Sequence, residues 1–83
     1  MLKLFDVLVG HLPPGTHPGE RTGFRLQCWV NSIPAEDSAA ACEKATHFLS
    51  LQGKTGLRVK SWRYHLEAPR PGGEEEQCEF PST

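Results

Sequence analysis

Hydrophobic and polar residues alternate along two stretches near the start of the chain, with the period of a β-strand. The first covers residues 2–12, where the two alternating sets are Phe5, Val7 and Val9, and Leu4, Asp6 and Leu8. The second covers residues 24–33, with Phe24, Leu26, Cys28 and Val30 on one face and Arg25, Gln27, Trp29 and Asn31 on the other. Pro34 keeps the residue before it extended, so the second strand continues to Ile33. The pattern predicts two strands joined as a hairpin.

The stretch from Asp37 to Gly53 has the period of one amphipathic helix. Asp37 suits the N-cap, where its carboxylate accepts from free backbone N–H groups, and Gly53 suits the position after the last turn because it adopts positive φ. Residues with the helical spacing are Ser38, Ala41, Cys42, Ala45, Phe48, Leu49 and Gln52. The small residues come first, so we expect the first half of the helix to lie close to a sheet.

A third strand is predicted over residues 57–67, but its apolar residues change parity between Val59 and Trp62. A one-residue bulge near Lys60–Ser61 would restore a single apolar face. The residues facing the helix would then be Leu57, Val59, Trp62, Tyr64 and Leu66, and those facing outward Arg58, Lys60, Arg63 and His65. The competing interpretation is a Trp62 that faces solvent.

The order strand, strand, helix, strand predicts an α+β fold. A helical crossover makes the third strand parallel to the second, so it pairs antiparallel with the first in a right-handed connection. We therefore expect a three-stranded antiparallel sheet of order 2-1-3 with one helix on one face, which is half-ferredoxin-like. Residues 1–67 would form this single domain, with a long hairpin loop at residues 11–23. Residues 68–83 would be an acidic, flexible tail, although residues 77–80 could add a short edge strand.

Composition narrows the function classes. The chain has 83 residues and a net charge of −1. Eight Lys/Arg against six Asp/Glu make residues 1–67 mildly basic, whereas the tail is acidic. This is not the strongly basic chain expected of a duplex-DNA binder. Three cysteines without a close-spaced pair argue against a secreted disulfide scaffold, so we expect a cytoplasmic protein. No stretch is apolar enough to span a membrane, and no membrane partner is expected.

Residues that could carry chemistry do not group in sequence. The histidines are His11, His17, His47 and His65, and none forms a zinc-type pair with a cysteine. We interpret them as surface or loop residues. Cys42 and His47 fall on different faces of the predicted helix, and neither a nucleophile-elbow serine nor a phosphate-binding glycine loop is present. The prediction is no enzyme, no cofactor and no metal.

The outward sheet face is the predicted binding surface. An exposed tryptophan among arginines has the composition of an interface hot spot. The candidate partner-binding residues are Arg25, Trp29, Arg58, Lys60 and Arg63 of the sheet, with His17 and Arg21 of the loop. The alternatives are a solvated sheet face, a homodimer through that face, and a single-stranded nucleic-acid site in which Trp29 stacks on a base.

In architecture, residues 24–66 resemble small phage-encoded inhibitors such as anti-CRISPR proteins, several of which combine a few antiparallel strands with a capped, alanine-rich helix. The resemblance rests on the helix from Asp37 to Ala45 and its flanking strands. It implies a non-enzymatic inhibitor that occupies a surface of a larger protein or nucleoprotein complex in the host cytoplasm. Small toxin-immunity proteins would look similar.

Overall fold

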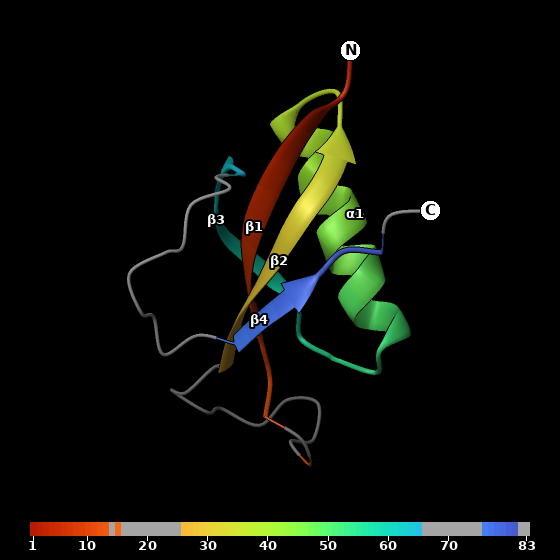
Figure 1. The fold of residues 1–83 in the computed structure, drawn as a ribbon. Coiled ribbons are helices and arrows are strands. Elements are labelled where there is room, and N and C mark those ends of the chain that lie inside the picture. Colours follow the sequence, from red (N-terminus) through yellow and green to blue (C-terminus); the bar gives the residue numbers. More distant parts are fainter. Residues whose placement is uncertain (14, 16–25, 66–75, 82–83) are drawn as a thin grey trace.

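A sheet of four strands with one helix on one face makes up the part of the chain that the structure, a computed structural model, describes, namely residues 1–13, 15, 26–65 and 76–81. The strand order is β3-β1-β2-β4 (Figure 1). The strands are β1 (Lys3–His11), β2 (Leu26–Ala35), β3 (Arg58–Tyr64) and β4 (Glu76–Glu79), and the helix is α1 (Ser38–Leu51). No helix among these residues is long and apolar enough to cross a membrane.

The predicted α+β class is confirmed, and so is the order of the first three strands. β1 pairs antiparallel with both β2 and β3. The prediction of a purely antiparallel, three-stranded sheet is wrong, because β4 pairs parallel with the outer edge of β2. Within the predicted tail, residues 76–79 thus form a strand, while residues 68–75 and 82–83 lie outside the described residues, as does most of the predicted loop at 11–23.

The helix forms and ends as its sequence predicts. The Asp37 side chain accepts a hydrogen bond from Ala40 N at 2.8 Å, and Gly53 adopts φ +87° just after the helix. α1 packs chiefly over β1 and β2, and less over β3. Small helix residues allow this close approach. The buried apolar residues are Phe5, Val7, Val9, Cys28, Val30, Ile33, Ala35, Ala41, Ala45 and Leu49.

The predicted bulge in β3 is confirmed. Leu8 is opposite Ser61 and Val9 is opposite Val59, so Lys60 has no residue opposite it. Directly paired residues share a face, and the apolar side chains of β3 therefore lie on the same side of the sheet as the helix. They are not buried, however: Val59 is 37%, Trp62 42% and Tyr64 54% exposed. They lie on the helix side of the sheet, as expected, but α1 does not cover them, because it lies over the centre of the sheet and β3 is the edge strand. Trp62 is therefore exposed to solvent, as the competing interpretation has it.

β2 contains a second bulge, which the sequence analysis does not predict. Phe5 is opposite Ile33 and Val7 is opposite Val30, so Asp6 faces two residues of β2, Asn31 and Ser32. Ser32 adopts φ +62°, a left-handed conformation that is uncommon for serine. The bulge turns Ile33 and Ala35 into the core beside Val30.

Candidate functional site

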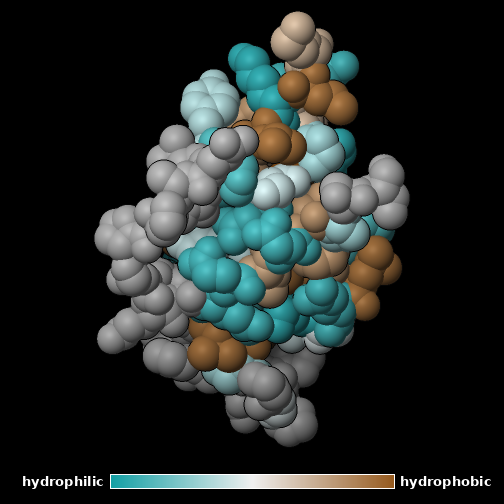
Figure 2. Space-filling model, viewed as in Figure 1, coloured by the Kyte–Doolittle hydropathy of each residue, from teal (hydrophilic) through white to brown (hydrophobic). Residues whose placement is uncertain are grey.

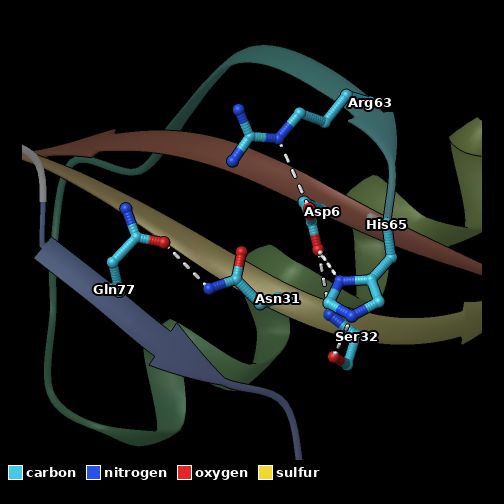
Figure 3. Close-up of polar contacts among 6 residues, drawn as sticks. All are labelled: Asp6, Asn31, Ser32, Arg63, His65 and Gln77. Atoms are coloured by element: carbon cyan, nitrogen blue, oxygen red, sulfur yellow. Dashed lines mark hydrogen bonds and ion pairs between the residues drawn. The ribbon is translucent and has the colours of Figure 1, made fainter. Parts of the chain in front are cut away.

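A buried carboxylate lies at the centre of the sheet face opposite the helix. Asp6 is 0% exposed and lies beside the β2 bulge (Figure 3). Its Oδ1 accepts a hydrogen bond from Ser32 N at 3.1 Å and lies 2.9 Å from His65 Nδ1. Arg63 Nε donates to Asp6 Oδ2 at 3.3 Å. We call Asp6, Ser32, Arg63 and His65 the Asp6 cluster. Burying an aspartate is costly unless donors surround its carboxylate, and the cluster provides them.

In the Asp6 cluster, a serine, a histidine and an aspartate are linked in the order found in serine hydrolases. Ser32 Oγ lies 3.3 Å from His65 Nε2, and His65 Nδ1 contacts the carboxylate of Asp6. A catalytic serine also needs backbone donors aimed at the developing oxyanion. Here the N–H of Ser32 donates to Asp6, and the same carboxylate accepts from Arg63. The geometry therefore suits a network that fixes the β2 bulge and joins β3 to β2.

Trp29 lies on the same sheet face, but its ring is not free. The Arg63 guanidinium carbon is 3.8 Å from the ring centroid, a cation–π contact. Trp29 is half-buried, and Trp62 is the more exposed of the two tryptophans. This face is hydrophilic across its middle (Figure 2). Asp6 and Asn31, which the alternation places on the outward face, are buried at 0% and 6% exposure. The sheet face that is predicted to be open is therefore partly covered by polar contacts among its own side chains.

Among the residues that the structure describes, the most exposed aromatic side chains lie on the other side of the sheet, along β3. The Trp62 and Tyr64 rings pack at 5.4 Å from each other, and both contact Phe5 below, at 5.6 and 5.3 Å between centroids. Lys3 Nζ lies 5.9 Å from the Tyr64 ring. We call Val59, Trp62 and Tyr64 the aromatic edge. Phe5 is fixed in the core, so the exposed rings rest on a rigid base.

The structure places the predicted partner-binding residues in different settings. Trp29 and Arg63 contact each other on the sheet face, while Arg58 and Lys60 are exposed along β3. Lys60 lies in the bulge beside the aromatic edge, and Arg58, which pairs with Gly10, lies on the opposite face of the sheet. The remaining three, His17, Arg21 and Arg25, lie outside the described residues. Trp62 and Tyr64 are predicted to face the helix, with a solvent-exposed Trp62 as the alternative, so neither is among the predicted partner-binding residues. The exposure of β3 could have been predicted, because a single helix is too narrow to cover the strand at the edge of the sheet.

A groove of about 380 Å³ lies between the end of β1 and the turn after α1, lined by residues 11–13 and 52–55. His11 lines it and is only 3% exposed. Its Nδ1 lies 3.3 Å from Leu12 O, and its Nε2 has no hydrogen-bond partner among the described residues. The expectation of a surface or loop histidine is therefore wrong for His11. In the described ranges no group of three or more potential metal ligands comes together.

Comparison of the chain with protein-family models, curated proteins and solved structures finds no match. The architectural resemblance to anti-CRISPR proteins therefore stays a prediction.

Proposed function

We propose that this protein is a small, non-enzymatic protein-binding module whose binding surface is the aromatic edge of β3. One observation carries the proposal: Trp62 and Tyr64 are 42% and 54% exposed, although they rest on the buried Phe5 ring. Tryptophan and tyrosine held in a fixed position bind a partner with little loss of conformational entropy. Trp29 is the anchor that the sequence predicts, but its contact with Arg63 makes Trp62 the better candidate.

Charge suggests the chemistry of the partner. Among the described residues, two exposed cations belong to the aromatic edge: Lys3, whose Nζ lies 5.9 Å from the Tyr64 ring centroid, and Lys60, in the bulge of β3. Arg58 pairs with Gly10 and therefore lies on the opposite face of the sheet. A protein that presents an apolar side chain framed by carboxylates would complement this surface. A second copy of the chain would bring like charges together, which disfavours the homodimer. The bulge at Lys60–Ser61 interrupts the edge of β3, so side chains rather than a long added strand would provide most of the binding energy.

Single-stranded nucleic acid remains the alternative partner, because Trp62 and Tyr64 could also stack on bases. The geometry favours it less: the two rings are nearly perpendicular, at 87°, so they present no common stacking plane. At Trp29, a base would first have to displace the Arg63 guanidinium. The resemblance to anti-CRISPR proteins implies that such a protein binder would inhibit a larger complex, and this stays a prediction.

The test is affinity capture with matched variants. The tagged protein, Trp62→Ala and Leu51→Ala are passed through lysate of the native host. Leu51 serves as the control because it is also apolar and is 75% exposed, at the end of α1. We expect a retained protein that is lost with Trp62→Ala and kept with Leu51→Ala. Titration of the purified pair should show affinity reduced at least about tenfold by Trp62→Ala. Equal retention by both variants would refute the proposed surface.

The non-enzymatic part of the proposal has its own test, at the serine with the most suggestive geometry. We expect no labelling of Ser32 by a fluorophosphonate probe, because the backbone N–H of Ser32 is already bonded to Asp6. Labelling that disappears in Ser32→Ala would show an activated nucleophile and overturn this part. A labelled single-stranded oligonucleotide tests the alternative partner: tight binding that weakens steeply with salt would favour it.

A further inference from the structure

Two cysteine side chains that are 50 positions apart in sequence meet between β2 and β4. Cys28 Sγ lies 3.1 Å from Cys78 Sγ, and both thiols are free. Cys28 is completely buried, while Cys78 is half-buried at the sheet edge. A disulfide bond is about 2.05 Å long, so joining the two sulfurs needs a movement of only about 1 Å.

The strand that carries Cys78 has few other attachments. β4 has four residues and, among the described strands, pairs only with β2. Asn31 Nδ2 donates to Gln77 Oε1 at 2.9 Å (Figure 3), and Phe80 N donates to Asn31 O at 2.9 Å. Beyond the strand, the Phe80 ring contacts Phe48 of α1 at 5.5 Å between centroids. Such a short edge element belongs to the part of a fold that opens at low free-energy cost.

We propose that Cys28 and Cys78 are a site of reversible oxidation, whose disulfide fastens β4 to β2 and whose reduction releases it. The third cysteine differs from this pair in its position in the fold. Cys42 lies on α1 and makes no described contact with another thiol. It provides an internal control within the same chain.

The oxidant we name is a low-molecular-weight disulfide such as oxidised glutathione. The Cys78 thiolate, which is the more accessible, attacks one sulfur of the oxidant; the S–S bond breaks, and one thiol leaves with the electron pair and takes up a proton. The Cys28 thiolate then attacks Cys78 Sγ, forming the protein disulfide and releasing the second thiol. Two protein thiols are oxidised and one disulfide is reduced. Burial, and then the hydrogen bond to Cys78, raise the pKa of Cys28 to about 12, so the second step is the slow one.

The first experiment counts thiols in the intact full-length chain. The protein is equilibrated in buffers of increasing oxidised-to-reduced glutathione ratio, alkylated with N-ethylmaleimide and weighed by mass spectrometry. We expect two of the three thiols to disappear together, with a cross-linked peptide pair containing Cys28 and Cys78. Cys42→Ser should behave in the same way. Three alkylated thiols at every ratio, or a cross-link through Cys42 or between two chains, would overturn the proposal.

The second experiment follows β4 itself. We expect the amides of residues 76–79 to exchange with solvent at least tenfold more slowly in the oxidised protein. We also expect the melting temperature to rise by at least about 10 °C, because the disulfide would close a loop of 50 positions in the unfolded chain. Cys78→Ser should abolish both changes, and because Cys78 is half-buried this variant keeps the core intact, unlike Cys28→Ser. Equal exchange in the two redox states would show that the bond, if it forms, does not control β4.

Discussion

The Arg63 guanidinium lies 3.8 Å above the Trp29 ring while its Nε donates to the buried Asp6. One side chain thus covers the tryptophan and supports the carboxylate, which links β3 to β2 across the middle of the sheet. This relationship explains why the sheet face opposite the helix, which the sequence predicts to be exposed, is partly buried in the fold. Substitutions at Arg63 can therefore separate the contribution of its charge from that of its stacking on Trp29.

Removing Arg63 should therefore expose Trp29. In a Trp62→Phe background, where Trp29 is the remaining tryptophan, we expect Arg63→Ala to shift the emission maximum to longer wavelength and to increase quenching by acrylamide. The same variant should lower the free energy of unfolding by about 2 kcal/mol, because Asp6 loses a charged donor. Arg63→Lys is the control that keeps the charge without the planar stacking group. Unchanged emission in Arg63→Ala would show that the cation–π contact does not cover the ring in solution.

Asp6 should be among the residues most sensitive to substitution. Asp6→Asn keeps the shape but removes the charge that Arg63 pairs with and places an amide NH2 among donors, so we expect a loss of about 3 kcal/mol in the free energy of unfolding. Asp37→Ala, which removes an exposed N-cap bond, should cost only about 1 kcal/mol. Urea denaturation measures both. A loss for Asp6→Asn no larger than that for Asp37→Ala would contradict a stabilising role for the cluster.

The two bulges show how much of the fold the alternation of apolar residues in the sequence can predict. In β3 the parity of apolar residues changes between Val59 and Trp62, and this predicts the bulge that the structure contains. The same change occurs in β2 between Val30 and Ile33, which are both buried, and there too the structure contains a bulge. The alternation up to Val30 is so regular that it suggests a uniform strand. Applied to both strands, the parity rule would also have predicted the bulge in β2, whereas the position of Asp6 opposite that bulge depends on the register between β1 and β2.

Other features depend on distances that periodicity does not contain. Trp62 and Tyr64 have the correct parity for the core, but their burial depends on how far α1 reaches across the sheet. β4 has only four residues, which is too short for a hydrophobic period, and it pairs with a strand about fifty positions earlier. The meeting of Cys28 with Cys78 follows from that pairing. Local pattern therefore predicts the elements, while the candidate sites arise from the contacts between them.

Ser32 offers a test of the β2 bulge that separates backbone strain from hydrogen bonding. Its φ of +62° is favourable for glycine and costly for other residues. Ser32→Ala loses the hydroxyl contact with His65 and keeps the strain, whereas Ser32→Gly loses the same contact and relieves it. We expect Ser32→Gly to be more stable than Ser32→Ala by about 1 kcal/mol. Thermal unfolding of the two variants measures the difference, and the reverse order would rule out a left-handed residue at this position.

The last prediction concerns alkaline pH and the Cys28 thiol. Burial raises the pKa of Cys28 from 9.0 to about 12 in the folded protein, so between these values the unfolded chain ionises first and binds fewer protons. The reduced protein should therefore keep its full stability below pH 9 and lose up to about 1.4 kcal/mol per pH unit above it. Cys28→Ala should lack this part of the decline, while Cys42→Ala should retain it. Urea denaturation of the three reduced proteins at pH 8 and pH 10 measures the difference; parallel declines for wild type and Cys28→Ala would mean that Cys28 ionises as readily in the folded protein as in the unfolded chain.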